Sequence, residues 1–250
     1  MSSSIGPTPF PFMLPTFSPA TQSPTVTPGT LPPEVTATDS FTTVPSARRH
    51  GRFDPAADVL PSMDWLNPLS YRMANPNKLP YRQASERTLV ADVMENRTPK
   101  EMEAAERLSK IGMDTLWYTY AQQFEDAFGI ARGRSLKTLL QAAIDEDGIA
   151  FSLEKKRYNE PRPYEVGVKS GGDSYPSGHS STAYAAATVL AAAWPERGEE
   201  FFKAAANVAK SRVYLGMHFA GDVSAGARLG MKVGKGMLRS EPEMAVPSAA

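Results

Sequence analysis

Residues that can hold an anion and move protons are concentrated between residues 155 and 222 of this 250-residue chain. The set comprises Lys155, Arg162, Ser177, Gly178, His179, Arg212, His218 and Asp222. Cations that converge need an anion. A guanidinium group matches phosphate oxygens with two parallel hydrogen bonds, whereas a lysine supplies a point charge. The residue types therefore predict an anion site suited to phosphate.

The sequence around Arg162 and Ser177 predicts that the backbone takes part in this site. Arg162 is flanked by prolines on both sides, so its backbone is restricted to extended conformations. Ser177 and Gly178 open an expected helix, whose N-terminal amides and dipole favour an anion. Ser177 can cap this helix or donate its hydroxyl to an oxygen, and the two roles are not exclusive.

The two histidines of this stretch could perform nucleophilic and acid–base chemistry. His218 and Asp222 are four residues apart, and on a helix they would share a face, where the carboxylate can hold the imidazole in one tautomer. An oriented neutral imidazole can act as a nucleophile, and His179 could protonate the leaving oxygen. Taken singly, each residue also has an ordinary structural explanation, as a surface arginine, a satisfied core histidine or an exposed helical pair.

The joint pattern resembles a known family signature. It consists of the blocks Lys155-x6-Arg162-Pro163, Pro176-Ser177-Gly178-His179 and Ser211-Arg212-x5-His218-x3-Asp222. All eleven specified positions match the three-part signature of the phosphatidic acid phosphatase type 2 superfamily. Neighbouring residues, among them Asp173-Ser174-Tyr175, are similar to the soluble bacterial class A nonspecific acid phosphatases.

The resemblance implies a role for each residue. His218 would attack phosphorus and carry a phosphohistidine, Asp222 would orient it, and His179 would protonate the leaving alcohol and later activate water. The phosphoryl oxygens would be held by Lys155, Arg162, Ser177, the Gly178 amide and Arg212. The resemblance also implies an α-helical bundle, a small phosphomonoester substrate, no metal and no cofactor. Homodimers are common among the similar enzymes.

Four alternatives to hydrolysis of small phosphomonoesters share these residues or part of them. A vanadium haloperoxidase would bind vanadate in the same anion cradle, but those enzymes are generally larger. A lipid-phosphate phosphatase of the multi-span kind needs long apolar helices, which this sequence lacks, but a soluble enzyme with a lipid-like substrate stays open. A phosphotransferase shares the intermediate and differs only in the acceptor. A non-catalytic phosphate-binding module would need the cations and amides but not an intact nucleophile, acid and carboxylate.

The elements that must position these residues are predicted to be helices throughout. Apolar spacing and end signals indicate helices over 83–96, 98–128, 134–144, 149–156, 178–194, 197–215 and 219–237. No convincing run of alternating strand residues occurs. The predicted fold class is therefore all-α, a compact helical bundle with short connections.

Two other patterns are interpreted as packing. The aromatic residues Trp117, Tyr118, Tyr120 and Phe124 have helical spacing and are expected in the core or an interface rather than in a stacking platform. Glycines 226, 230 and 234 are four apart, which permits close helix packing, and the phosphate-loop pattern GxxxxGK[ST] is absent.

Composition bounds the remaining questions. Residues 1–50 hold 10 of the 22 prolines and are predicted to form a disordered arm, followed by a lead-in over 51–97, the helical domain over 98–238 and a loose tail over 239–250. The formal net charge is zero, so nucleic acid binding is not expected. No apolar run approaches the length of a membrane span, which predicts a soluble protein, either cytoplasmic or exported by a non-standard route.

Overall fold

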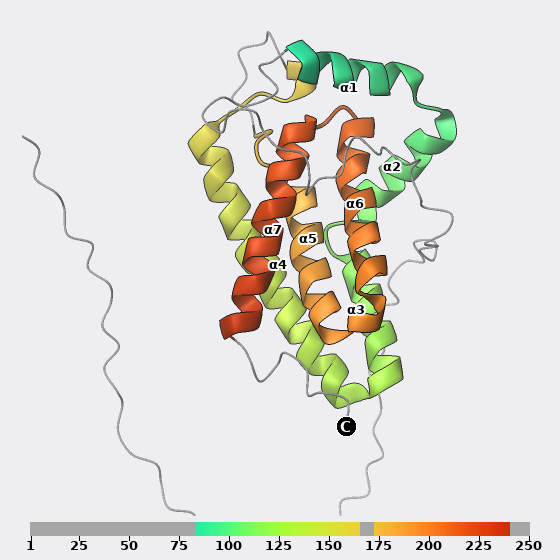
Figure 1. Cartoon of the computed structure of the whole chain (residues 1–250), viewed down its shortest axis with the longest axis vertical. Coiled ribbons are helices and arrows are strands. Elements are labelled where there is room, and N and C mark those ends of the chain that lie inside the picture. Colours follow the sequence, from blue (N-terminus) through green and yellow to red (C-terminus); the bar gives the residue numbers. More distant parts are fainter. Residues whose placement is uncertain (1–83, 166–172, 241–250) are drawn as a thin grey trace, which may run out of the picture. The chain divides into compact units, whose positions relative to one another are not determined.

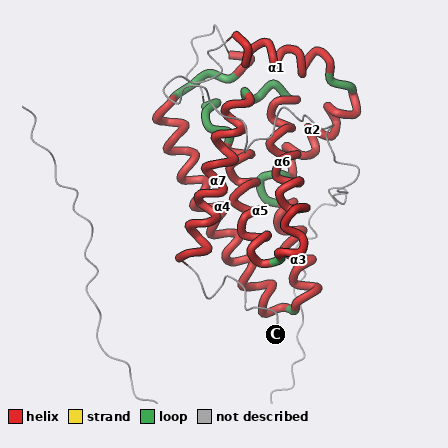
Figure 2. Tube along the Cα trace, viewed as in Figure 1, coloured by secondary structure: helices red, strands yellow, loops and turns green. Residues whose placement is uncertain are grey.

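The computed structural model describes residues 84–165 and 173–240, and this part of the chain folds into seven α-helices (Figures 1 and 2). They are α1 (Ala84–Asn96), α2 (Pro99–Ile111), α3 (Thr115–Phe128), α4 (Ile130–Tyr158), α5 (Gly178–Ala193), α6 (Gly198–Tyr214) and α7 (Ala220–Ser240). Two 3-10 turns, Pro163–Glu165 and Pro195–Arg197, connect them. The described residues contain no strand, and the prediction of an all-α bundle is confirmed.

The predicted domain boundaries fall mostly outside the described residues. The arm over 1–50, most of the lead-in over 51–97 and the end of the tail over 239–250 are not described, and these predictions stay untested. Within the lead-in, the helix expected over 83–96 is present as α1. None of the helices in the described segments combines the length and apolar character that a membrane span requires.

The prediction of a single helix over 98–128 is wrong, because the helix is interrupted between α2 and α3. The predicted start of this helix is confirmed, and the structure adds a capping box there, in which Thr98 and Glu101 satisfy one another's backbone N–H groups. At Gly112, however, the backbone N–H closes α2 onto the Leu108 carbonyl, and the Gly112 carbonyl accepts a hydrogen bond of 2.8 Å from the Trp117 indole. Asp114 then caps α3. A glycine followed two residues later by an N-cap residue was the signal for this break.

The two helices predicted over 134–144 and 149–156 are in fact one continuous helix, α4. The run Asp145-Glu146-Asp147-Gly148 resembles a helix end, but Gly148 lies in the helix with open space beside it. Asp147 is fully buried and accepts hydrogen bonds from the hydroxyls of Ser181 and Thr182 on α5. This contact with a neighbouring helix carries α4 through a stretch of weak helix formers. As a result, Lys155 lies in its last turn.

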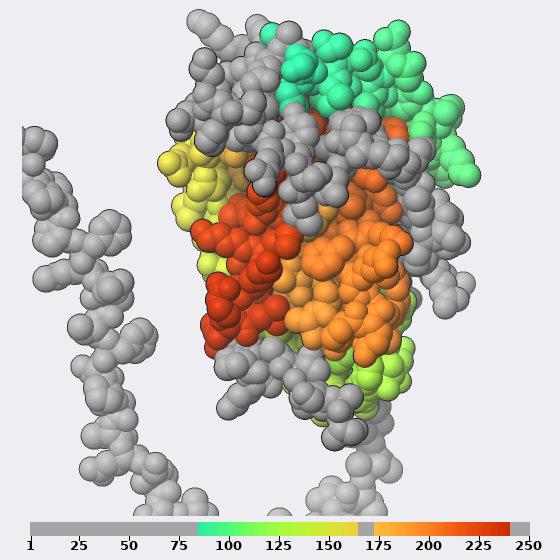
Figure 3. Space-filling view, in the orientation of Figure 1, coloured from blue at the N-terminus to red at the C-terminus, as the bar shows by residue number. Residues whose placement is uncertain are grey.

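Helix α5 lies at the centre of the bundle, packed against α4, α6 and α7 (Figure 1). Helix α7 approaches it through the glycines at 226, 230 and 234, as the spacing predicted. A Cβ atom at Gly230 would lie 1.9 Å from the Ser181 carbonyl oxygen, and one at Gly226 would lie 2.3 Å from that of Ser177. Only a residue without a side chain fits there. Helices α6 and α7 form much of the coloured face in Figure 3.

The aromatic residues of α3 lie in the core, as predicted. Trp117 and Tyr120 are fully buried, and Phe124 is nearly so. The Tyr120 ring packs edge-on against Phe201 of α6, with ring centroids 4.9 Å apart. Tyr118 is only partly buried and packs against the outside of this core. This cluster joins α3 to the N-terminal end of α6.

Candidate active site

The eight predicted site residues come from the ends of four helices, and the fold brings these ends together near the edge that α1 crosses (Figure 1). Lys155 is in the last turn of α4, and Arg162 follows that helix directly. Ser177, Gly178 and His179 begin α5. The last three are Arg212 in the final turn of α6, His218 in the α6–α7 connection and Asp222 in the first turn of α7.

His218 and Asp222 form a buried pair. Both side chains are at most 3% exposed, and the His218 Nδ1 lies 3.6 Å from the Asp222 Oδ2, slightly beyond a hydrogen bond. Because α7 begins only at Ala220, the pair does not lie on one helix face as the spacing suggested. Instead, Asp222 turns back over the start of α7, where its Oδ2 accepts hydrogen bonds from the Phe219 N–H at 3.0 Å and the Ser174 hydroxyl at 2.6 Å.

Lys155 and Arg162 meet at one loop residue. Lys155 Nζ donates to the Asp173 carbonyl oxygen, and Arg162 Nε donates to the Asp173 carboxylate at 2.7 Å. Arg162 Nη1 also reaches the carbonyl oxygen of Met217, the neighbour of His218, at 3.5 Å. These contacts aim both cations at the connection that carries His218.

Arg212 reaches the site from the other side. Arg212 is buried, with 4% of the residue exposed, and its Nη1 donates a hydrogen bond to the hydroxyl of Ser109 on α2. Its carbonyl oxygen accepts hydrogen bonds from the Met217 and His218 amides, at 2.9 and 3.3 Å, which fixes the turn before the histidine. Arg212 therefore acts on His218 both as a charge and through its backbone.

Burial and the three cations set the charge states of the pair. Burial lowers the pKa of His218 well below its usual range, and the charges of Lys155, Arg162 and Arg212 lower it further. Burial raises the pKa of Asp222 to about 6. At neutral pH the imidazole is therefore uncharged beside an ionised carboxylate, which is the state in which an imidazole nitrogen can attack an electrophile.

The cations are themselves destabilised by burial. Loss of solvent lowers the pKa of Lys155 to about 8 and that of Arg212 to about 10, with repulsion from Arg162 contributing to both. Charges of one sign that are poorly solvated and close together gain most from a bound anion. The site is thus electrostatically prepared for a phosphate-like group.

His179 is held by α2. Its Nε2 lies 3.1 Å from the carbonyl oxygen of Ser109, and because a carbonyl only accepts, Nε2 carries the hydrogen in this arrangement. Burial and then the charge of Arg212 lower the pKa of His179 to about 3. The Nδ1 atom of the neutral ring is left with a lone pair that can accept a proton, and once protonated it can donate that proton.

The N-terminus of α5 faces the same region. The Ser177 hydroxyl accepts a hydrogen bond of 3.4 Å from the Ser180 amide, so its capping role is confirmed, and its own amide donates to the Asp222 carbonyl oxygen at 3.0 Å. Gly178 is buried, and a Cβ there would lie 3.1 Å from the Phe151 ring. The amides of the first turn have no acceptor within the helix and can hold an anion.

Several buried atoms of this region lack a hydrogen-bond partner among the described residues. They include Arg212 Nε, His218 Nδ1 and Asp222 Oδ1. Buried polar atoms are rarely unpaired in folded proteins, and those that are often belong to functional sites. Three unpaired atoms within one predicted site agree with a role in binding and catalysis rather than in structure.

Sequence reasoning missed three residues that support the site. Asp173 and Ser174 stood beside the signature in the stretch Asp173-Ser174-Tyr175, so proximity was an available signal for them. Ser109 gave no signal, because it is an ordinary serine of α2, 46 residues before Lys155. Only the tertiary fold shows that it touches both His179 and Arg212.

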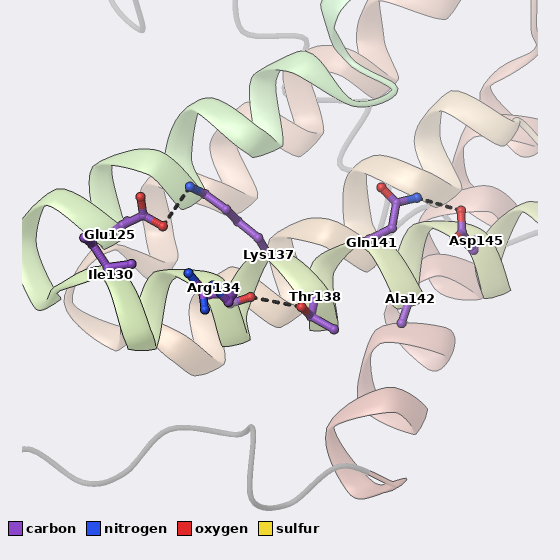
Figure 4. Close-up of a pocket in the computed structure, with 8 residues that line it drawn as sticks. All are labelled: Glu125, Ile130, Arg134, Lys137, Thr138, Gln141, Ala142 and Asp145. Atoms are coloured by element: carbon purple, nitrogen blue, oxygen red, sulfur yellow. Dashed lines mark hydrogen bonds and ion pairs between the residues drawn. The ribbon is translucent and has the colours of Figure 1, made fainter. Parts of the chain in front are cut away.

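A second cluster of cations lies elsewhere. A groove of about 610 Å³ runs along the end of α3 and the first half of α4 (Figure 4). Its lining includes Arg134 and Lys137, but Lys137 Nζ is paired with the Glu125 carboxylate at 2.8 Å. None of the eight predicted site residues lines this groove.

The comparisons with known proteins agree with this arrangement. The model of the PAP2 superfamily matches residues 139–243, a span that includes all eight predicted site residues, and over this region the chain is similar to that superfamily. A non-specific acid phosphatase from Providencia stuartii is 32% identical over 139 residues, which cover 49% of this chain and 56% of the relative. A non-specific acid phosphatase from Salmonella typhimurium is 38% identical over 69 residues, 28% of each chain. The chain thus matches about half the length of the first relative and less of the second.

One solved structure supports the fold, and a second is reported beside it. The crystal structure of LpxE from Aquifex aeolicus superposes with a TM-score of 0.52 at 21% identity, covering 65% of this chain and 99% of that one. A transmembrane PAP2 type phosphatidylglycerolphosphate phosphatase from Bacillus subtilis has a TM-score of 0.49 at 19% identity, covering 76% of this chain and 96% of that one. At such identities the first likeness concerns the fold alone.

Proposed function

We propose that this protein hydrolyses phosphate monoesters without a metal, through a phosphohistidine formed on His218. The observation that carries the proposal is the state of that residue: a buried, neutral imidazole beside the Asp222 carboxylate, within the field of three cations. The named acid phosphatases among the relatives support the same reaction class.

In the proposed reaction, the phosphoryl group lies among Lys155, Arg162 and Arg212, with the amides at the start of α5 completing the cradle. Nε2 of His218 attacks phosphorus, a P–N bond forms, and the bond to the leaving oxygen breaks. Nδ1 then carries its hydrogen toward Asp222, which stabilises the imidazolium. Water attacks the phosphohistidine in the second step, breaks the P–N bond and releases inorganic phosphate.

His179 is the proposed acid and base. In the ligand-free protein its low pKa keeps the ring neutral, so it must gain a proton before it can donate one. A bound phosphate ester brings negative charge to a region where Arg212 and burial suppress the imidazolium, and this raises the pKa of His179. A monoanionic ester also brings a proton that His179 can pass to the leaving oxygen. The ring then takes a proton from the attacking water.

The deciding experiment is the hydrolysis of para-nitrophenyl phosphate by the full chain in excess EDTA. We expect turnover in the wild type and in His50→Ala, which alters the one histidine outside the predicted site, and no turnover in His218→Ala. A phosphorylated protein trapped by a denaturing quench at alkaline pH, where the P–N bond of a phosphohistidine is stable, should be present only in the first two. Turnover in His218→Ala would overturn the nucleophile assignment, and loss of wild-type turnover on adding EDTA would overturn metal independence.

The acid role of His179 is tested by varying the leaving group. An alkyl phosphate needs protonation of its leaving oxygen, whereas para-nitrophenolate leaves without it. His179→Ala should therefore lower kcat by about 10²–10⁴ for an alkyl phosphate and by much less for the aryl ester. Equal losses on both substrates would contradict the assignment.

The same protein preparation separates the alternatives. Halide oxidation with added vanadate would identify a haloperoxidase. Hydrolysis of a long-chain lipid phosphate in preference to a water-soluble ester would identify a lipid phosphatase. Transfer to an added alcohol in preference to water would identify a phosphotransferase. Phosphate binding without any turnover would identify a binding module.

A further inference from the structure

Helix α1 lies across the chain segment that presents His218 (Figure 1). It precedes the region matched by the PAP2 model, and none of its residues belongs to the predicted site. Its last turn and the residue that follows it nevertheless touch the end of α6 and the α6–α7 connection. The Met94 side chain covers Gly216, where a Cβ would lie 2.4 Å from the sulfur, and the Arg97 guanidinium donates to the carbonyl oxygen of Tyr214.

The first turn of α1 brings a carboxyl group to the start of α7. Glu86 is only 2% exposed, and neither of its carboxyl oxygens makes a hydrogen bond of normal geometry to a described residue. The groups that act on it are the Asp222 carboxylate, through its charge, and the backbone N–H groups of Gly221 and Ala220, through hydrogen bonding; these two are the first residues of α7. Burial and the negative charge of Asp222 raise the pKa of Glu86 to about 7.

Burial of the Glu86 carboxyl lowers the stability of the fold, because its desolvation is not offset by a full set of hydrogen bonds. Buried polar groups of this kind are rare and call for an explanation, such as a role in a functional site. The amides at the start of a helix attract its oxygens, while Asp222 repels the charged form. These two influences meet on the turn that holds Asp222 against His218. Glu86 thus acts on the Asp222 side of the pair.

We propose that α1 is part of the catalytic apparatus and that Glu86 is a positioning residue, which holds the first turn of α7 so that Asp222 stays against the His218 ring. Met94 and Arg97 hold the other end of the same connection. The proposal rests on the proposed function, because it assigns Glu86 to the nucleophile of that reaction.

Kinetics on para-nitrophenyl phosphate at about pH 6.5 provide the first test. This pH lies between the pKa of Asp222, about 6, and that of Glu86, about 7, so Asp222 is mostly ionised and the Glu86 carboxyl is mostly uncharged. Glu86→Gln therefore preserves the size and polarity of the Glu86 side chain, whereas Glu86→Ala removes it. Misplacement of a reacting group by about 1 Å can cost about 10² in rate, and we expect Glu86→Ala to lower kcat by about 30-fold with KM within about threefold. Glu86→Gln should recover most of kcat. The matched control is Glu95→Gln, an exposed acid of the same helix, which should leave both constants unchanged.

A second readout does not depend on turnover. The chain has three histidines, so the ring nitrogen resonances of His218 and His179 can be assigned by NMR with single substitutions. Glu86→Ala should shift the His218 resonances and leave those of His179 in place. Unchanged kcat and unchanged His218 resonances in Glu86→Ala would overturn the proposal. A common shift of both histidines with loss of thermal stability would also overturn it, because general loosening of the fold produces that result. A wild type without turnover would refute the proposed function and leave the NMR test of Glu86 intact.

Discussion

The two ends of α4 place the same kinds of side chain in different surroundings. Along its first half, Arg134 and Lys137 border an open groove, where Lys137 is paired with Glu125 (Figure 4). At its C-terminal end, Lys155 joins Arg162 and Arg212 around one buried histidine. Solvent screens the first group and is largely excluded from the second. The contrast shows that convergence and burial, rather than the presence of arginine and lysine, define an anion site.

The same contrast recurs for other residue types. In α7, Gly230 lies against the backbone of α5, whereas Gly236 has open space beside it. In α4, Asp147 is buried between hydroxyl groups, whereas Asp145, half a turn earlier, is exposed. In each pair, a substitution of the buried residue is the test, and the same substitution of the other residue, on the same helix, is its matched control.

The largest effect is expected on catalysis, from the substitution of a buried arginine compared with that of an exposed one. Arg212→Ala removes a desolvated charge that acts on both His218 and His179. Removal of one preorganised donor from an oxyanion site typically costs about 10²–10³ in rate, and we expect kcat/KM on para-nitrophenyl phosphate to fall by about 10³. Arg134→Ala, which changes the same side chain in the groove, should leave kcat/KM within about twofold, because the charge is exposed and screened. Similar losses in the two variants would refute the distinction between the two ends of α4.

Most of the fold was predictable because amphipathic spacing and end signals are local. The helix start at residue 98 and the close packing through the glycines of α7 were both predicted correctly from the sequence. The errors occurred where tertiary contacts override local preference. Asp147 lies in a run that looks like a helix end, but its hydrogen bonds to α5 keep α4 continuous. Conversely, Gly112 closes a helix that apolar spacing alone would continue.

The predicted site residues were accessible from the sequence because their types and spacing form a joint pattern, and the fold brings all eight to one region. Their catalytic roles remain predictions that the experiments above address. The residues that support the site could not be predicted from the sequence. Ser109 and Glu86 precede the signature by tens of residues and belong to ordinary helical stretches, so only the packing of α1 and α2 reveals their position. The geometry of the pair was also beyond the sequence, since Asp222 reaches His218 from the first turn of α7 rather than along a shared face.

The glycines of α7 should give the next largest effect. A Cβ at Gly230 would lie 1.9 Å from the Ser181 carbonyl oxygen, so Gly230→Ala must push α5 and α7 apart. Overpacking of this kind, against backbone that cannot rotate away, should lower the free energy of unfolding by about 3 kcal/mol or more. Gly236→Ala meets nothing within 4 Å and should raise it by about 0.5–1 kcal/mol, because alanine favours the helix. Urea unfolding of both variants measures these two changes in the free energy of unfolding. A Gly236→Ala variant less stable than the wild type would contradict the prediction.

The smallest effect is expected from the acidic residues of α4, and it is a change in how the free energy of unfolding depends on pH. Burial raises the pKa of Asp147 to about 6 from an ordinary value of 3.8, although hydrogen bonds from Ser181 and Thr182 oppose the shift. Between these two pH values the folded protein binds more protons at this site than the unfolded chain, so the contribution of Asp147 to stability falls as pH rises. The slope for one such group is at most about 1.4 kcal/mol per pH unit.

Asp147→Asn removes that titration and keeps a polar side chain opposite the two hydroxyls. The free energy of unfolding of the wild type, relative to Asp147→Asn, should therefore decrease between about pH 4 and pH 6 and become constant above this window. Asp145→Asn removes a carboxylate from the exposed side of the same helix and should show no such slope. Because each comparison is a difference from the wild type, the titrations of His179, His218 and Asp222 cancel. A flat difference for Asp147→Asn would mean that water or movement of α5 solvates the carboxylate, and the contact that carries α4 past Gly148 would then be weaker than its burial indicates.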